Sequence, residues 1–485
     1  MKDLTVILFF SLLFLFTFFL HQKYMNHEIS GIHDWRQTQT AWNIRNFARY
    51  DFNILNPRVA SFNGGKDNIY RYEFPIYQWT IGGLQKILGE DVRIIRYFTL
   101  FLGFFTLLGF YILLSNIGFN KNVAIFGSFA LNFSPVFYYY TINPIPDNLA
   151  LFGAIWFLAF FFRNLNQFSI FNTIFSAFFL SLSIAAKLPF VLFGGTLVFY
   201  FISQVIRNKT LFNKKIIFQA LIYFVFIIPT ILWYLWVMPS WENGVTSGIF
   251  ANRITWRKAL EILDYHTYIM FPKKLMNFAL LFLLIIGFGK ILNSKHLKSF
   301  RFNLLLIPFI LFVLYFVFEL NMIDIVHDYY MFPFLPFIYI IISYGFYAFL
   351  ENQSSIFSKT LLIILIIFIP CLTIYQNKNS WDPYSYKEIY EKQHNFINAV
   401  PKDELCIILN DESGYILPYL IDKRGHIFSN DHLPKEWVKD IANRYKIKYM
   451  YSTSRKVESE IAEYIQDTLY SYKNINVLEL NTEMK

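Results

Sequence analysis

Long runs of apolar residues recur from Leu4 to Tyr375, and they constrain the fold of this chain more than any other feature of its sequence. The runs are rich in Phe, Leu and Ile and are separated by short polar breaks. A bilayer core of about 30 Å is crossed by a helix of roughly 20 apolar residues, a length that these runs reach repeatedly. Only 16% of the 485 residues are charged, against 55% that are hydrophobic. The composition excludes an ordinary soluble globular fold and predicts a polytopic α-helical membrane protein.

We expect about eleven membrane-spanning helices from these runs. Short polar segments separate neighbouring runs, and the break at Lys187-Leu188-Pro189 suits a tight helical hairpin. The expected spans cover residues 4–20, 96–116, 122–141, 148–163, 168–186, 188–206, 216–237, 275–293, 303–320, 331–350 and 360–376.

The orientation of these helices is predicted by the lysines and arginines of the short loops, because basic loops stay in the cytoplasm. One set of loops is basic, whereas the opposite turns hold Lys187 against acids such as Asp147, Glu319 and Asp324. We therefore expect a multi-pass protein of a bacterial inner (cytoplasmic) membrane with an extracytoplasmic C-terminal domain. The asymmetry accounts for most of the net charge of +10, so we expect no nucleic-acid partner. The basic set includes Lys121, Arg163, Lys214, Lys215, Lys290, Arg301 and Lys359.

Two domains follow from this topology. Residues 1–376 form the membrane domain, whose first outer loop is 21–95, and residues 377–485 form a small α/β domain. The tail contains neither a G-x-G-x-x-G sequence nor a P-loop, so nothing marks it as a nucleotide site. Its expected strands are Leu405–Leu409, Ile427–Phe428, Ile447–Tyr451 and Val477–Leu480, and its expected helices include Lys387–Ala399 and Lys435–Tyr445.

The first outer loop opens with His33-Asp34-Trp35-Arg36-Gln37, ahead of an amphipathic stretch that runs to Tyr50. Mixed aromatic and basic residues of this kind favour a helix in the membrane interface. Two interpretations of Asp34 stay open: a helix cap that binds free N–H groups, or a catalytic carboxylate, and capping does not exclude catalysis. Arg36 is a candidate ligand for substrate or phosphate.

The end of the same loop holds Arg71 and Glu73 in the sequence Tyr-Arg-Tyr-Glu-Phe-Pro. Pro75 forces the preceding residue to be extended and suits the first turn of a helix. Glu73 is therefore expected on a defined bend beside the membrane, where helix-end stabilisation and a functional role are equally consistent with the sequence.

Further ionisable side chains mark the outer ends of later spans. Asp147 begins the fourth span, Lys187 lies at the turn between the fifth and sixth spans, and His327 lies in the turn before a late span. Lys187 alone is consistent with simple snorkelling to the interface. Ionisable groups near a bilayer are more often functional, and these come from separate loops that share one predicted membrane face. Tyr329 and Tyr330, beside His327, are expected to line the same polar site.

At these positions the chain resembles the GT-C superfamily of membrane glycosyltransferases, in the branch of protein O-mannosyltransferases and lipid A aminoarabinose transferases. The likeness rests on the Asp of HDWRQ, the Tyr-Arg-Tyr-Glu-Phe-Pro segment and the His-Asp-Tyr-Tyr turn, and it covers residues 1–350. It implies that Asp34 is the catalytic carboxylate and that Glu73 occupies the Glu-x-Pro position of the aminoarabinose transferases. Those enzymes commonly have Lys between Glu and Pro, whereas this chain has Phe74, which weakens any inference of the same donor sugar.

The resemblance implies an inverting transfer of a sugar from a polyprenyl-phosphate donor to a lipid, glycan or protein acceptor at the outer face. Asp34 is then the base, Glu73 and Asp147 orient the acceptor or Asp34, and cationic groups stabilise the leaving phosphate. We expect no required cofactor, and a divalent metal stays an open alternative that the sequence does not indicate. No Asp-x-Asp motif is present, which counts against a nucleotide-diphosphate donor held by Mg²⁺. The predicted phosphate ligands are Arg36, Arg71, Lys187 and His327, with Tyr329 and Tyr330 beside them.

Two alternatives stay open at this point. One is a ligase or oligosaccharyltransferase that moves whole glycans from a polyprenyl diphosphate, since such enzymes also combine many spans with an outer catalytic face. The other is a flippase or transporter of lipid-linked sugars. Transporters usually place ionisable residues near the bilayer midplane of repeated halves, a pattern that this sequence does not show.

Overall fold

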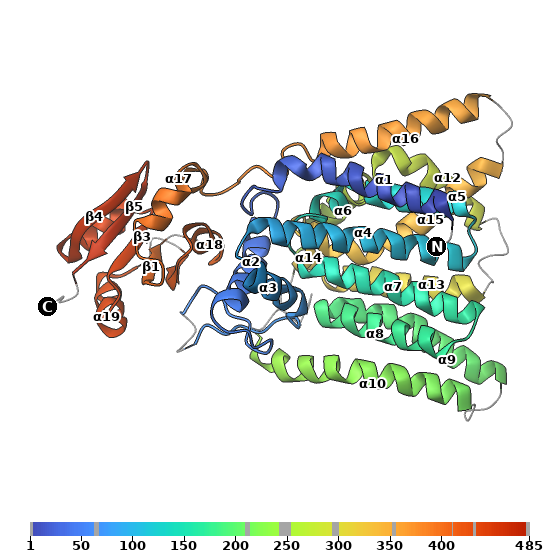
Figure 1. Ribbon diagram of the computed structural model, residues 1–485, viewed down its shortest axis with the longest axis horizontal. Coiled ribbons are helices and arrows are strands. Elements are labelled where there is room, and N and C mark those ends of the chain that lie inside the picture. Colours follow the sequence, from blue (N-terminus) through green and yellow to red (C-terminus); the bar gives the residue numbers. More distant parts are fainter. Residues whose placement is uncertain are drawn as a thin grey trace. The chain divides into compact units, whose positions relative to one another are not determined.

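A computed structural model of the chain describes residues 3–62, 67–208, 214–241, 254–292, 300–351, 356–409, 411–429 and 433–481 (Figure 1). Its contacts divide the chain into two compact units. The first unit comprises residues 1–25, 72–77 and 96–378, and the second comprises 26–71, 78–95 and 379–485. The second unit thus contains the tail from residue 379 together with most of the first outer loop, which the sequence analysis assigns to the membrane domain.

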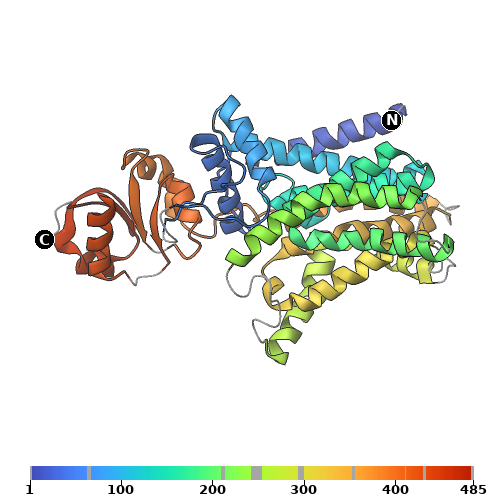
Figure 2. The ribbon, with the colours of Figure 1, turned by 90° about the horizontal axis from the view of Figure 1, so that it is seen from below.

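The first unit is helical, because a helix pairs backbone N–H and C=O groups within one segment and so suits apolar runs in a bilayer. Helix α1 lies alongside α4 in both views, with Phe14 stacked on Phe101 (Figure 1, Figure 2). Its main helices are α1 (Leu4–His21), α4 (Val92–Ile117), α5 (Lys121–Asn132), α6 (Pro135–Tyr140), α7 (Pro146–Asn166), α8 (Ile170–Ala186), α9 (Gly195–Asn208), α10 (Lys214–Val237), α11 (Trp256–Tyr265), α12 (Leu281–Leu292), α13 (Phe300–Phe318), α14 (Leu320–Ile323), α15 (Leu335–Glu351) and α16 (Ile356–Gln376).

Within the described residues, seven helices are long and apolar enough to cross a membrane, or eight if one bent pair counts as a single span. The chain is therefore a multi-pass membrane protein, but the predicted number of eleven is not confirmed. The expected span 122–141 is broken into α5 and α6, because Pro135 disfavours a helical conformation at Ser134. The expected span 275–293 belongs to the pair Trp256–Leu275 and Phe278–Leu292, which bends by 93°. Two further expected spans, around Ile170–Ala186 and Thr360–Gln376, are shorter apolar helices.

Glycines permit a close crossing of α12 and α15 in this unit. A Cβ atom on Gly345 of α15 would lie 1.8 Å from the carbonyl oxygen of Leu283 in α12, and one on Gly287 would lie 2.2 Å from the carbonyl oxygen of Ile341. Backbones approach this closely only where small residues face each other, which is the usual solution for helices packed in lipid. Residues 242–253 of the predicted middle loop lie outside the described residues.

The second unit contains the helices of the first outer loop, α2 (Asp34–Arg49) and most of α3 (Ile76–Leu88), together with the tail. The tail is built on a five-stranded sheet of order β2-β1-β3-β5-β4, in which β1 pairs in parallel with β2 and β3 while β5 pairs antiparallel with β3 and β4. The four predicted strands are present as β1 (Leu405–Leu409), β2 (Arg424–Phe428), β3 (Tyr449–Ser452) and β5 (Ile475–Leu480), and the tail also contains β4 (Ile465–Tyr472), α17 (Lys387–Asn398), α18 (Ile416–Ile421), α19 (Lys435–Tyr445) and α20 (Arg455–Glu460).

Candidate functional site

Asp34 is the first residue of α2, and its position is defined by an unusual backbone. His33, the residue before it, has φ of 54°, in the left-handed region that non-glycine residues rarely occupy. The Asp34 Oδ1 atom accepts a hydrogen bond from the N–H of Trp35 at 2.9 Å, but the N-cap position that the sequence suggested for Asp34 is occupied by His33. The second oxygen, Oδ2, is buried and has no hydrogen-bond partner among the described residues. One oxygen therefore anchors the side chain and leaves the other for chemistry.

The surroundings of Asp34 favour its neutral form. The residue is 6% exposed, and this burial raises the pKa of its carboxyl from 3.8 to about 6. The carboxylate of Asp411, in the tail, raises the pKa further, whereas the N–H of Trp35 and the imidazole of His33 oppose the rise. A carboxylate with a pKa near 6 is a stronger base than an exposed aspartate and is still ionised at neutral pH.

Hydrogen bonds to the first residues of the tail fix the loop that leads into Asp34. The hydroxyl of Ser30 donates to the carbonyl oxygen of Trp381 at 2.8 Å, and the N–H of Ile32 donates to that of Ser380 at 3.0 Å. The hydroxyl of Tyr390 donates to the carbonyl oxygen of Ile29 at 2.7 Å. The strained conformation at His33 is thus held from the tail.

The two arginines predicted in this unit bind groups of the outer loop. Arg36 is buried and donates to the Oε1 atom of Gln39, one turn further along α2. Arg71 donates to the carbonyl oxygen of Leu55 at 2.8 Å and to Oδ1 of Asn56 at 3.0 Å. These bonds order the outer loop, and a phosphate-binding role for either arginine stays a prediction.

The first unit brings Asp147 and Lys187 together. Pro146 and Asp147 begin α7, and Asp147 is 1% exposed. Its Oδ2 atom lies 3.7 Å from Nζ of Lys187, which caps the C-terminus of α8. A lysine that only snorkelled to the interface would extend into solvent, whereas only 14% of this side chain is exposed.

Glu73 joins the same cluster through its neighbours. The N–H of Phe74 donates to the carbonyl oxygen of Ala185 at 3.0 Å, so the bend that carries Glu73 is bonded to the end of α8. Both Glu73 and Asp147 interact electrostatically with the hydroxyl of Tyr234 in α10, which itself donates to the carbonyl oxygen of Ala185. The two acids predicted from distant segments are therefore close in space.

The His-Asp-Tyr-Tyr turn completes the cluster. The ammonium of Lys187 lies 4.8 Å from the ring centroid of Tyr330 and 5.6 Å from that of Tyr329, in the geometry of a cation–π contact. His327 donates from Nδ1 to the carbonyl oxygen of Met322 at 2.7 Å, and its ring packs edge-on against both tyrosines. We call Glu73, Asp147, Lys187, His327, Tyr329 and Tyr330 the lysine cluster.

A second ion pair beside this turn was missed by the sequence analysis. Nζ of Lys274 lies 3.7 Å from Oδ2 of Asp328, whose Oδ1 accepts a hydrogen bond from the hydroxyl of Tyr140 at 2.9 Å. The available signal was the pair Lys273-Lys274, two basic residues in a loop that the sequence places outside, where lysines are depleted.

Two observations bear on other kinds of site. Among the described residues, no three His, Cys, Asp or Glu side chains form a group that could hold a metal ion.

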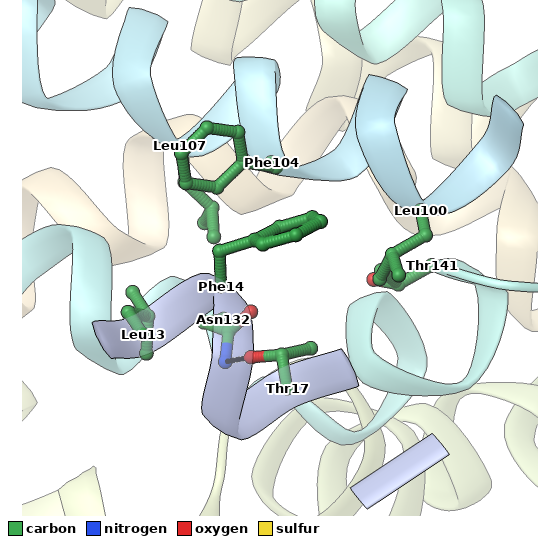
Figure 3. A pocket seen from close by; sticks show the side chains of 8 residues that line it. All are labelled: Leu13, Phe14, Thr17, Leu100, Phe104, Leu107, Asn132 and Thr141. Carbon is green, nitrogen blue, oxygen red and sulfur yellow. Dashed lines mark hydrogen bonds between the residues drawn. The ribbon is translucent and has the colours of Figure 1, made fainter. Parts of the chain in front are cut away.

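A small pocket beside α1 is lined by Leu13, Phe14 and Leu100 with Asn132, which donates to Oγ1 of Thr17 at 3.0 Å (Figure 3). Its volume of about 10 Å³ has room for about one water molecule, so it does not bind a sugar.

Comparisons with known proteins identify the architecture. Residues 73–233 match the family of dolichyl-phosphate-mannose-protein mannosyltransferases. The structure is similar to that of ArnT from Cupriavidus metallidurans, with a TM-score of 0.63 and 12% identity, over 98% of this chain and 97% of that one. The chain has the GT-C fold of membrane glycosyltransferases. This GT-C fold is also similar to the oligosaccharyltransferase of Archaeoglobus fulgidus, with a TM-score of 0.61 and 12% identity, over 93% of this chain and 70% of that one. No curated protein has a detectably similar sequence.

The family match contains three of the six residues of the lysine cluster. It begins at Glu73 and includes Asp147 and Lys187, whereas Asp34 precedes it and His327 follows it. The GT-C resemblance read from the sequence is thus confirmed. The role of each site residue stays a prediction.

Proposed function

We propose that this chain transfers a sugar from a polyprenyl-phosphate carrier to a hydroxyl of a lipid, glycan or protein acceptor at the outer face of the membrane. The observation that carries the proposal is the buried Asp34 carboxylate, held at a strained helix start with one oxygen unpartnered among the described residues, in a chain of GT-C fold. ArnT from Cupriavidus metallidurans has been solved with undecaprenyl phosphate bound, and it matches over 98% of both chains with a TM-score of 0.61. This supports a polyprenyl phosphate as carrier.

In the proposed reaction, Oδ2 of Asp34 accepts the proton of the acceptor hydroxyl as that oxygen bonds to the anomeric carbon. The bond from the anomeric carbon to the phosphate oxygen breaks on the opposite side, so the anomeric configuration inverts. The electron pair leaves with the polyprenyl phosphate, which gains a negative charge. We assign to Lys187 the fixed positive charge that stabilises that phosphate, because preorganised cations favour a transition state in which negative charge develops. Asp147 orients the Lys187 ammonium through their ion pair.

A second candidate is transfer of a whole glycan from a polyprenyl diphosphate. It is favoured by the likeness to the Archaeoglobus fulgidus oligosaccharyltransferase, which has been solved in complex with an inhibitory peptide and a dolichol-phosphate. That likeness leaves about a third of the larger protein unmatched, since the chain covers 69% of it.

The two candidates are separated by assaying monophosphate and diphosphate donors side by side. The purified full chain in lipid nanodiscs is supplied with a membrane glycolipid extract and with polyprenyl monophosphates or diphosphates that carry labelled sugars. We expect label to move only from the monophosphate donors. Movement from the diphosphate donors alone supports the second candidate, and movement of intact donor across a proteoliposome membrane without transfer supports transport. Mass spectrometry of glycans from cells with and without the protein then identifies sugar and acceptor.

A further inference from the structure

A polar cavity in the second unit is not used by the proposed reaction. Its volume is about 310 Å³, near the lower end of the ~300–1,000 Å³ typical of small-molecule sites. Three parts of the chain line it, with Tyr419 of the tail closing one side: the loop before α2, one face of α2, and the segment from the end of α3 to the first turn of α4. We call it the arginine cavity, and its polar walls include Glu28, Arg45, Arg49, Gln85, Glu90 and Tyr419.

The arginine cavity opens on the same face of α2 that carries Asp34. Successive residues of an α-helix are rotated by about 100° and rise about 1.5 Å, so residues eleven apart lie on one face about 16 Å from each other. Arg45 is eleven residues beyond Asp34, and Ala41, also in the cavity wall, is seven residues beyond it. A molecule whose reacting hydroxyl lies at Asp34 therefore reaches the cavity only if it is elongated.

The polar groups of the cavity are fixed in place before any ligand arrives. Arg45 donates to Oδ1 of Asp422 at 2.8 Å, and Arg49 binds both Asp422 and Glu90, at 2.7 Å and 2.6 Å. The hydroxyl of Tyr419 donates to Oε2 of Glu28 at 3.1 Å. Ordered donors and acceptors reduce the entropy that a ligand must lose on binding.

The charges that line the arginine cavity indicate whether its ligand is charged or neutral. Both guanidinium groups are already paired with carboxylates, and further acids, Glu28 and Asp91, line the cavity. A phosphate or carboxylate would meet a wall that holds more acids than bases. The lining combines these donors and acceptors with three apolar side chains, Ala41, Val92 and Ile95. A neutral polyhydroxylated ring, with hydroxyls at its edge and C–H groups on its faces, matches this lining.

We propose that the arginine cavity binds a neutral saccharide ring of the acceptor, several sugar units away from the hydroxyl that reacts at Asp34. This inference rests on the proposed function and narrows it: the acceptor is a glycan chain rather than a bare lipid head group or a polypeptide.

Binding is tested without turnover, by saturation-transfer difference NMR on the full chain in nanodiscs. The probes are neutral hexose di- and trisaccharides, inorganic phosphate, and an uncharged Ser/Thr-rich peptide. Ala41→Phe fills the cavity without removing a hydrogen bond, and Glu28→Ala removes an acceptor that a sugar hydroxyl would use. The matched control is Ala462→Phe, because Ala462 is an exposed residue of the tail. Asp34→Asn is included because it leaves the cavity intact.

We expect saccharide signals for the unmodified chain, Ala462→Phe and Asp34→Asn, their loss in Ala41→Phe, and an affinity about tenfold or more lower in Glu28→Ala. The proposal is overturned by the absence of any saccharide signal, by signals that persist in both cavity variants, or by phosphate or peptide signals that Ala41→Phe abolishes. If Ala41→Phe does not fold, the saccharide affinity of Glu28→Ala alone tests the proposal. The two proposals can fail separately. If the cavity variants lose saccharide binding but the unmodified chain transfers no sugar, the saccharide site is supported and the proposed function is refuted.

Discussion

The hydroxyl of Ser30 donates to the carbonyl oxygen of Trp381 at 2.8 Å, across 351 residues of sequence. This buried bond joins the loop that positions Asp34 to the first turn of the tail. Together with the bonds of Ile32 and Tyr390 to the same region, it gives the tail a direct part in the geometry around Asp34.

Ser30→Ala is expected to loosen the loop before Asp34, because Trp381 then keeps a buried carbonyl oxygen without this donor. The cost is about 1–2 kcal/mol of local stability. Hydrogen exchange is expected to be faster at residues 29–37 and unchanged in α19. The control is Ser459→Ala, which removes a comparable bond to the carbonyl oxygen of Lys456 on the exposed surface. Equal exchange rates in the two variants would contradict a positioning role for the tail.

The rate of transfer is expected to rise with pH and level off above about pH 6. Burial raises the pKa of Asp34 to about 6, and a general base acts only when it is deprotonated. The measurement is the pH dependence of transfer under single-turnover conditions. A profile that is flat between pH 5 and 7 would be inconsistent with Asp34 as the base.

Asp34→Asn is expected to stabilise the protein at neutral pH. A carboxyl whose folded pKa is raised from 3.8 to about 6 favours the folded state only while it is protonated. Folding therefore carries a penalty above about pH 6, on the order of 2–3 kcal/mol, that fades as the pH falls toward 4. Asparagine keeps an oxygen for the N–H of Trp35 and has no charge to bury. Thermal unfolding in detergent at pH 7.5 and pH 4 checks this, and an equal difference at both pH values would show that burial of the charge is not the cause.

Lys187→Met is expected to reduce transfer by about 10²–10³-fold and to destabilise the first unit. The variant removes the cation assigned to the leaving phosphate and takes from buried Asp147 its ion-pair partner. The double variant Lys187→Met/Asp147→Asn is expected to regain stability without regaining activity. Lys290→Met serves as control, since the pair of Lys290 with Glu351 is exposed and contributes little to stability. Recovery of activity in the double variant would argue against a direct role for Lys187.

The apolar runs predicted the membrane helices because length and composition determine whether a segment can cross a bilayer. The loop topology predicted one shared membrane face for six ionisable residues, and the structure brings four of them together in the lysine cluster: Glu73, Asp147, Lys187 and His327. The sequence analysis did not find β4, because this edge strand is mostly exposed and its sequence, Ile465–Tyr472, has no alternating apolar pattern. It also joined α5 and α6 into one span, since an apolar run remains apolar where Pro135 breaks the helix.

Ion pairs between residues far apart in the chain could not be predicted from the sequence. Arg49 and Asp422 are separated by 373 residues, and the sequence around either residue does not indicate its partner. The grouping of the first outer loop with the tail depends on such pairs, and so does the arginine cavity. The sequence placed Lys187, Tyr329 and Tyr330 at the same membrane face, but it did not predict the contacts of Lys187 with the two tyrosines.

The central claim is that Asp34 is the base for sugar transfer from a polyprenyl-phosphate donor. The most direct measurement compares single-turnover transfer by the unmodified chain, Asp34→Asn and Asp34→Glu, each reconstituted and shown to fold. The account predicts a loss of about 10²–10⁴-fold in Asp34→Asn and a partial recovery in Asp34→Glu. Transfer by folded Asp34→Asn at close to the rate of the unmodified chain would contradict it.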